Sequence, residues 1–136
     1  QCISDIRKSL SPIARHLRID IQWDIADEAN DFPLRDGPTW VAAATNLIHN
    51  AVQAGDHVRV SVTPTENGQL LVRVADNGNG VPEHVAGELF EPFVTSKPEG
   101  MGLGLSVARR AAKHLGGDVI WKREDNWTIF EMTASK

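Results

Sequence analysis

Apolar residues recur along the chain with two periods, one typical of helices and one typical of strands. A spacing of three or four residues, which predicts an amphipathic helix, connects Ile3, Ile6, Leu10, Ile13 and Leu17. Strict alternation, which predicts a half-buried strand, follows at Ile19, Ile21, Trp23 and Ile25. The segment 27–37 is polar and rich in turn-forming residues, and within it Phe32, Pro33 and Leu34 suggest a short edge strand. The first quarter of the chain is therefore expected to fold as a helix that leads into a strand.

The helical period returns from Pro38 to Ala54, where Gly55 ends a second, longer helix. Two alternating apolar segments, 58–62 and 70–74, are joined by the turn pair Asn67-Gly68 and predict a β-hairpin. The segment 76–98 is rich in glycine and proline and is expected to be mostly loop, with a short helix near residues 83–89. A third helical pattern over residues 103–115 ends at Gly116-Gly117, and strands at 119–122 and 128–133 complete the chain.

This order of elements is helix, strand, helix, hairpin, loop, helix, hairpin. Strands that follow one another in sequence favour antiparallel neighbours, so the order predicts an α+β fold. We expect a two-layer α/β sandwich whose mixed, mostly antiparallel sheet is covered on one face by about three helices. A length of 136 residues is typical of one domain, and we assign residues 1–136 to it.

Composition and charge exclude several classes of protein. The net charge of −4 and the scattered basic residues leave no cationic surface for a nucleic-acid backbone. The longest uncharged apolar run, residues 40–44, is far shorter than the roughly 20 residues that cross a bilayer. Cys2 is the only cysteine, which excludes an internal disulfide and a zinc site of the CxxC type. Because the chain begins with Gln1 rather than Met, we expect a fragment whose upstream partner is missing.

One face of the long helix is unusually rich in amides. At about 100° per residue, Asn46, His49, Asn50 and Gln53 fall within one narrow sector. An exposed helical face normally carries Glu, Lys and Arg, whereas each mid-helix Asn costs several tenths of a kcal/mol relative to Ala. This face therefore indicates a surface for a polar ligand or a hydrated cation, with a merely exposed polar face as the alternative.

The hairpin ends in Asp76-Asn77-Gly78-Asn79-Gly80. A carboxylate at the end of a core strand accepts hydrogen bonds from an exocyclic amine, and glycines let the backbone approach a flat ring. This combination suits adenine. An ordinary Asp-Asn-Gly turn is the alternative for this segment taken alone.

A second glycine-rich segment opens the third helix and consists of Gly100, Met101, Gly102, Leu103, Gly104 and Leu105. Amide groups at such a helix start favour a phosphate, although the segment is neither a dinucleotide fingerprint nor a P-loop. Upstream, Phe90 and Phe93 could anchor a lid, and Lys97 follows two hydroxyl residues, Thr95 and Ser96, within reach of a phosphate. A plain surface loop is the alternative for this upstream part.

Taken in this order, the four segments resemble those of the ATP-binding catalytic domain of sensor histidine kinases, which belongs to the Bergerat-fold superfamily with gyrase and the MutL repair proteins. Residues 46–51 match the N box of that family, and Asp76-x-Gly78-x-Gly80 matches its G1 box. Residues 90–93 match the F box and residues 100–105 the G2 box. The segment 128–130 is similar to the last-strand Thr-x-Phe, although Trp127 stands where Gly is usual. The stretch 90–105 is most similar to the nitrogen-regulator and oxygen-sensor branch.

The resemblance implies ATP and Mg²⁺ as cofactors, with Asn50 as the metal ligand and Asn50, His49 and Lys97 as the catalytic residues. Asp76 would accept a hydrogen bond from the adenine amino group. Gln53 departs from the pattern, because many relatives carry Lys there. The full set implied to contact the nucleotide is Asn46, Asn50, Gln53, Asp76, Gly78, Gly80, Val81, Thr95, Ser96, Lys97, Gly100, Met101, Gly102, Leu103, Gly104, Leu105 and Thr128.

The resemblance also implies a reaction and its partners. Hydrolytic members of the superfamily carry a Glu four residues before the metal-binding Asn, and Asn46 occupies that position here. No acidic residue follows any of His16, His49, His57, His84 and His114, so the phosphoacceptor His is expected on a separate dimerisation domain. The implied activity is transfer of the γ-phosphoryl group to that His and onward to the receiver domain of a response regulator. The domain is expected to be cytoplasmic, and the parent protein a homodimer.

Two other functions stay open at this point. One is a protein-serine kinase of the anti-sigma-factor type, and the other is a non-catalytic, nucleotide-dependent interaction module. A slow ATPase is disfavoured because Asn46 cannot activate water as a Glu does.

Overall fold

The computed structural model describes residues 20–27, 29, 32–34, 36–78 and 104–135. Its elements in chain order are β1 (Asp20–Ile25), α2 (Gly37–Ala54), β2 (His57–Pro64), β3 (Gln69–Asp76), α4 (Gly104–His114), β4 (Val119–Glu124) and β5 (Trp127–Ser135). The strands form one sheet in the order β1-β2-β3-β5-β4. β1 and β2 are parallel, and the other three pairs are antiparallel. The predicted α+β class with a mixed, mostly antiparallel sheet is confirmed.

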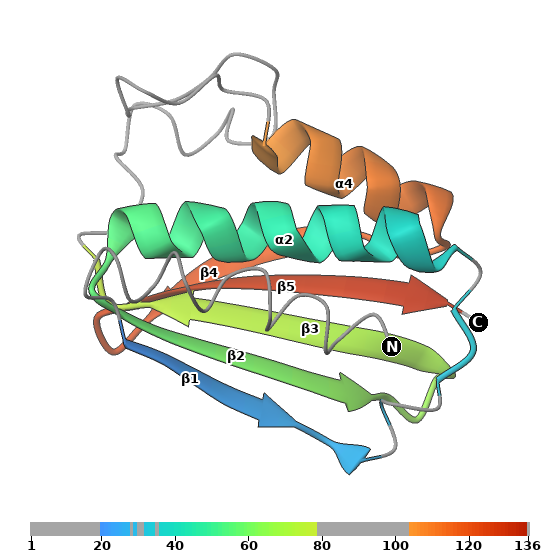
Figure 1. Ribbon diagram of the computed structural model, residues 1–136, viewed down its shortest axis with the longest axis horizontal. Helices are drawn as coiled ribbons and strands as arrows, with labels where there is room; N and C mark the ends of the chain where they lie inside the picture. The colour runs from blue at the N-terminus through green and yellow to red at the C-terminus, as the bar shows by residue number, and fades with distance from the viewer. Residues whose placement is uncertain (1–19, 28, 30–31, 35, 79–103, 136) are drawn as a thin grey trace.

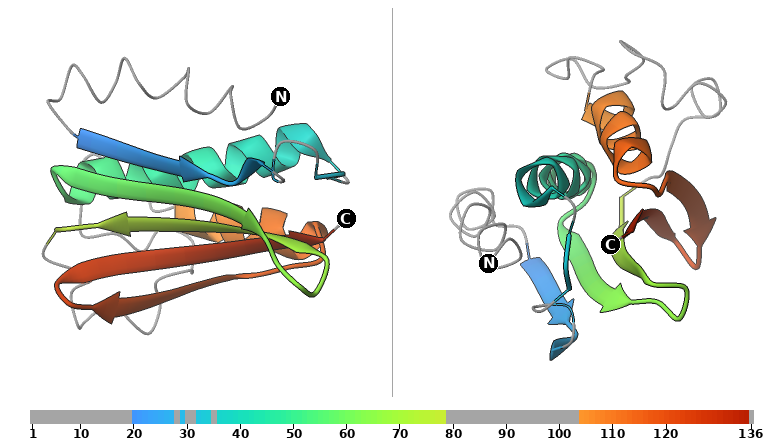
Figure 2. Two further views of the ribbon diagram at one scale, coloured as in Figure 1. Left: turned by 90° about the horizontal axis from the view of Figure 1, so that it is seen from below. Right: turned by 90° about the vertical axis from the view of Figure 1, so that its right-hand side faces the viewer.

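Both described helices pack against the same face of this sheet (Figures 1 and 2). The core between the layers is apolar, and its largest side chains with less than 2% exposure are Trp40, Phe130, Leu47, Ile48, Leu70, Leu115, Met132, Val58, Val60, Val72, Val74 and Val119. Burying one such side chain contributes about 1.5–3 kcal/mol to folding. Within the part of the chain that the structure describes, no helix is long and apolar enough to cross a membrane.

The segment before α2 differs from the sequence prediction. Phe32, Pro33 and Leu34 form no strand. The amide of Ala29 donates to the carbonyl of Ala26 at 3.0 Å, and the amide of Phe32 donates to that of Ala29 at 3.2 Å, so the backbone turns on itself instead of joining the sheet. Pro33 also lacks the N–H that a strand ladder needs. The predicted helices at residues 3–17 and 83–89 lie outside the described residues.

Helix α2 is capped by Asp36, a residue that the sequence analysis did not single out. Asp36 accepts hydrogen bonds from the amide of Thr39 at 3.2 Å and from its hydroxyl at 2.6 Å, which satisfies a free amide of the first turn. Pro38 follows at the start of the helix, where its missing N–H removes no helical hydrogen bond. These two signals explain why the helix starts one residue before the predicted position.

Helix α4 ends at two glycines that serve different purposes. Gly116 has φ of +81°, the left-handed conformation typical of a residue that terminates a helix. The amides of Gly116 and Gly117 donate to Lys113 and Ala112, which completes a Schellman motif. A Cβ at Gly117 would lie 1.8 Å from the carbonyl oxygen of Thr133 in β5, so only glycine fits there.

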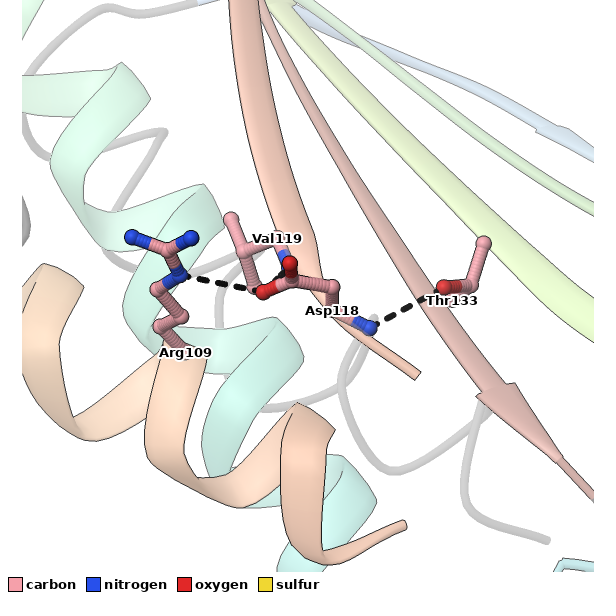
Figure 3. Close-up of polar contacts among 4 residues, drawn as sticks. All are labelled: Arg109, Asp118, Val119 and Thr133. Atoms are coloured by element: carbon pink, nitrogen blue, oxygen red, sulfur yellow. Dashed lines mark hydrogen bonds and ion pairs between the residues drawn. The ribbon is translucent and has the colours of Figure 1, made fainter. Parts of the chain in front are cut away.

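A polar clamp then fixes α4 to the edge of the sheet (Figure 3). The Nε of Arg109 donates to Asp118 at 3.0 Å, and the same carboxylate oxygen accepts from the amide of Val119 at 2.8 Å. The amide of Asp118 donates to the hydroxyl of Thr133 at 3.1 Å. Partial burial, the largest single cause, raises the pKa of Asp118. The hydrogen bonds from Arg109 and Val119, with the nearby positive charges of Arg109 and Lys113, outweigh it and leave the pKa below its ordinary value.

Arg109→Met is expected to lower the free energy of unfolding at pH 7 by about 0.5–1 kcal/mol, because exposed ion pairs are worth little. The side chains of Arg109 and Asp118 are 39% and 42% exposed. A lowered folded-state pKa stabilises the fold above the ordinary carboxyl pKa of about 3.9, and this contribution disappears as the pH falls through the folded-state value. Urea unfolding of the parent and variant from pH 7 to pH 2.5 should show the difference shrinking on acidification. A difference that is constant with pH, or an equal effect of Arg110→Met at the exposed neighbouring position, would contradict this role.

Candidate functional site

The predicted functional residues on the sheet gather at one end of it. Antiparallel pairing brings the carboxyl end of β3 beside the amino end of β5, so that Asp76 lies opposite Thr128. The amino end of β2 and the carboxyl end of α2 meet at the same end, on the left in Figure 1. Segments that are about 50 residues apart in sequence are therefore adjacent in space.

Asp76 is the buried carboxylate of this site. Its residue is 1% exposed, and one carboxylate oxygen accepts a hydrogen bond from the amide of Gly78 at 3.0 Å. A carboxylate in such a position needs hydrogen-bond donors, because burying an unpaired charge is costly. The arrangement suits a ligand that presents N–H groups.

Asn77 fastens the end of β3 to the start of β2. Its side-chain oxygen accepts from the amides of Asp56 and His57 at 3.1 and 3.0 Å, and its side-chain nitrogen donates to the Asp56 carboxylate at 2.9 Å. This last hydrogen bond is the main reason why the pKa of Asp56 lies below its ordinary value. The Asp-Asn-Gly turn is thus held from both sides.

Two glycines allow this turn to touch the end of α2. A Cβ at Gly78 would lie 2.2 Å from the carbonyl oxygen of Ala54, and a Cβ at Gly55 would lie 2.6 Å from the side-chain oxygen of Asn77. Gly55 itself has φ of −138°, so its role is close approach and not a left-handed turn. Gly78 was predicted to make room for a flat ring, and the structure gives it a second role against the helix backbone.

Thr128 and Arg123 complete the described part of the site. Thr128 is 3% exposed. One nitrogen of Arg123, Nη1, donates to the Thr128 hydroxyl at 2.7 Å and to the carbonyl oxygen of Gly78 at 2.9 Å. The arginine thereby connects β4, β5 and the turn after β3.

The amide face of α2 lies on the side of the helix away from its buried stripe. Asn46 and Asn50 are half-buried, whereas His49 and Gln53 are exposed. The buried residues of the helix lie on the other side and are Trp40, Ala43, Ala44, Leu47, Ile48, Ala51 and Val52. The predicted division of this helix into an apolar and a polar face is confirmed, and the ligand role of the polar face stays a prediction.

The second glycine-rich segment is described only at its end. Gly104 and Leu105 are the first two residues of α4, and the Leu105 side chain packs against the core. The remaining predicted site residues lie outside the described residues and are Gly80, Val81, Thr95, Ser96, Lys97, Gly100, Met101, Gly102 and Leu103. Asp76, Gly78 and Thr128 are the predicted residues that the structure brings together, through strand pairing and hydrogen bonds.

The donor chemistry of the site fits Mg²⁺ only together with a phosphate. Among the residues that the structure describes, no three His, Cys, Asp or Glu side chains come together as a metal site. The side-chain oxygen of Asn50 is a neutral, hard donor of the kind that Mg²⁺ accepts alongside phosphate oxygens and water. A single amide ligand is therefore chemically sufficient when the nucleotide supplies the other ligands.

The sequence analysis did not predict that Asn77 links the end of β3 to the start of β2, and it did not identify Arg123 as a site residue. Asn77 was part of a recognised motif, but its partners Asp56 and His57 are about 20 residues away and carry no signal of the contact. Arg123 belongs to no motif. Its position opposite Thr128 follows only from the pairing of β4 with β5, which is set by the two-residue turn at Asp125 and Asn126.

A groove of about 620 Å³ lies elsewhere, on the sheet face opposite α2 and α4. Its lining includes Arg59, whose guanidinium lies 4.3 Å from the centre of the Trp127 ring, and Ala75, Glu124 and Ile129. None of the predicted site residues lines it. The groove and the Asp76 site are therefore separate features.

Comparison with known proteins agrees with this geometry. The tetrathionate sensor histidine kinase TtrS from Salmonella typhimurium is 35% identical over 122 residues, which cover 79% of this chain and 20% of that protein. The full-length kinase ShkA, solved in complex with AMPPNP, is 25% identical with a TM-score of 0.77, over 99% of this chain and 30% of that one. The catalytic domain of histidine kinase ThkA, solved nucleotide free, has a TM-score of 0.86 at 24% identity, over 99% of this chain and 90% of that one, and shows the shared fold.

This chain thus spans about a fifth of TtrS. The finer assignment to the nitrogen-regulator and oxygen-sensor branch stays a prediction. The family profile described as histidine kinase-, DNA gyrase B- and HSP90-like ATPase matches residues 36–136, which include every described element except β1. The chain belongs to this family of ATPases.

Proposed function

We propose that this chain is the ATP-binding catalytic domain of a two-component sensor histidine kinase. The observation that carries the proposal is the buried Asp76 carboxylate, paired across the sheet with Thr128 and packed against the end of α2 through Gly78. Family membership and the sensor kinases among its relatives support the same function. The gyrase-like hydrolytic alternative is disfavoured by Asn46, which stands where those enzymes carry a general base.

In this proposal the base of ATP binds at the end of the sheet. Asp76 accepts a hydrogen bond from the adenine amino group, and Thr128 contacts the same edge of the ring. Gly80 and Val81 continue the base pocket from the turn that Asp76 begins. A buried carboxylate favours a ligand that presents a donor group, because it can only accept hydrogen bonds and a ligand acceptor at the same place would be repelled.

The phosphates lie along the amide face of α2. Asn50 is the ligand for Mg²⁺, and Asn46, His49 and Gln53 lie around it on the same helix. The amides at the start of α4, with Thr95, Ser96 and Lys97, hold the β- and γ-phosphates. A Mg²⁺ held by Asn50 would neutralise negative charge on the phosphates.

The proposed reaction transfers the γ-phosphoryl group to a histidine nitrogen of a separate dimerisation domain. The nitrogen forms a bond to the γ-phosphorus while the bond from that phosphorus to the β,γ-bridging oxygen breaks, and ADP leaves. This chain supplies positioning and charge stabilisation, which are the main requirements of phosphoryl transfer. The receiver domain of a response regulator then takes the phosphoryl group from the histidine, in a cytoplasmic homodimer of the whole kinase.

Asp76→Asn is expected to weaken ADP binding by about 1.5–3 kcal/mol, the range for a hydrogen bond to a charged group. The amide retains the size of the carboxylate, so the fold should persist. Titration calorimetry with ADP gives the affinity, and Asp24→Asn, at an exposed position on β1, is the matched control. Unchanged ADP affinity in the Asp76 variant would show that Asp76 does not contact the base and serves only in the turn after β3.

Asn50→Ala should abolish the dependence of ADP affinity on Mg²⁺ while the domain stays folded, because alanine is the better helix former. With a phosphoacceptor domain added in trans, formation of acid-labile phosphohistidine from γ-labelled ATP should fall by at least about 100-fold, as expected when positioning of the reacting groups is lost. Asn67→Ala, in the β2–β3 turn at the other end of the sheet, is the control. Parental Mg²⁺ dependence and parental transfer in a folded Asn50→Ala variant would show that the metal site was misassigned.

A further inference from the structure

Arg123 is an exposed arginine, and its hydrogen bonds to the residues that the structure describes go to two acceptors of the site, one hydroxyl and one backbone carbonyl. Its Nη1 atom carries two hydrogens and has two acceptors, the Thr128 hydroxyl at 2.7 Å and the Gly78 carbonyl at 2.9 Å. Both contacts are within the range of strong, charge-assisted hydrogen bonds. Arg123 belongs to none of the motifs that carry the family resemblance.

The contact with Thr128 has a directional consequence. A guanidinium is always charged at physiological pH and can only donate, so the Thr128 oxygen must accept from it. A hydroxyl has one hydrogen and two lone pairs, so Arg123 occupies one lone pair and leaves the hydrogen and the other lone pair of Thr128 for further partners. Its cross-strand partner is Asp76, which as a carboxylate can only accept. The end of the sheet therefore presents one acceptor, Asp76, beside a hydroxyl that has lost one of its two acceptor positions and has kept its single donor hydrogen.

This polarity matches one class of purine. The pairing edge of adenine offers a donor, its amino group, next to an acceptor, its ring nitrogen N1. The same edge of guanine has the opposite order, with an acceptor oxygen next to an N–H donor. Asp76 as acceptor and Thr128 as donor complement adenine and oppose guanine.

We propose that Arg123 is a positioning residue for base selection: by donating to Thr128, it occupies one of the two acceptor positions of that hydroxyl and so increases the preference for adenine over guanine nucleotides. The second contact, to the Gly78 carbonyl, keeps the turn after Asp76 in register with the Thr128 side of the pocket. The inference rests on the proposed nucleotide site. It adds a residue from the β4–β5 hairpin that does not itself touch the base.

The test measures dissociation constants for ADP and GDP on the same protein preparations. Arg123→Met removes the donor and retains the apolar stem, and Arg123→Gln replaces it with a group that can also accept. Both should lower the ratio of the GDP to the ADP dissociation constant by about three- to tenfold, the equivalent of one net hydrogen bond. Arg123→Lys, which can only donate, should retain most of the parental ratio. Arg110→Met, on the exposed face of α4, is the matched control and should leave the ratio unchanged.

A double-mutant cycle separates this role from a general loss of stability. In a Thr128→Val background, which has no hydroxyl to orient, Arg123→Met should have no further effect on the ratio. The inference is overturned if folded Arg123→Met and Arg123→Gln variants keep the parental ratio, or if they weaken ADP and GDP equally. Failure of the parent protein to bind ADP would instead refute the proposed nucleotide site.

Discussion

The close contact between the turn after β3 and the carboxyl end of α2 is the constraint on which the site depends. Gly78 lies so near the Ala54 carbonyl that any larger residue would separate the helix from the sheet. The Asn77 side chain locks the same junction through three hydrogen bonds to Asp56 and His57. The Asp76 carboxylate and the amide face of α2 therefore have fixed relative positions, which is the preorganisation that binding of a charged, extended ligand requires.

A second junction holds α4 at its carboxyl end. Gly117 packs on the Thr133 carbonyl, and the Arg109–Asp118 pair links the helix to β4. Gly117 lies just beyond the carboxyl end of α4 and Arg109 lies near its middle, so the first turn of the helix is positioned by the rigid element behind it. The fold thus fixes both helices through glycine contacts and short polar clamps, while the apolar core between the helices and the sheet supplies most of the stability.

The sequence predicted the elements well because their signals are local. Alternating valines on β2 and β3, the helical period from Pro38 and the Gly116-Gly117 stop each act within a few residues. The predicted strand at Phe32 to Leu34 was wrong, because a run of three apolar residues does not determine the partners of its backbone N–H and C=O groups. Asp76, Gly78 and Thr128 could be predicted from motifs. Arg123 could not, because its role arises from strand register and from a turn in which Asp125 and Asn126 both have positive φ.

The central claim is that one nucleotide spans the end of the sheet and the amide face of α2. Nuclear magnetic resonance of the labelled domain tests it most directly, first with ADP alone and then with Mn²⁺ as a paramagnetic substitute for Mg²⁺. The account predicts that ADP shifts the backbone amides of Asp76, Gly78 and Thr128, and that Mn²⁺ then broadens the side-chain amides of Asn46 and Asn50 first. Shifts centred on Arg59 and Trp127, in the groove of the opposite face, with no broadening on α2, would contradict it.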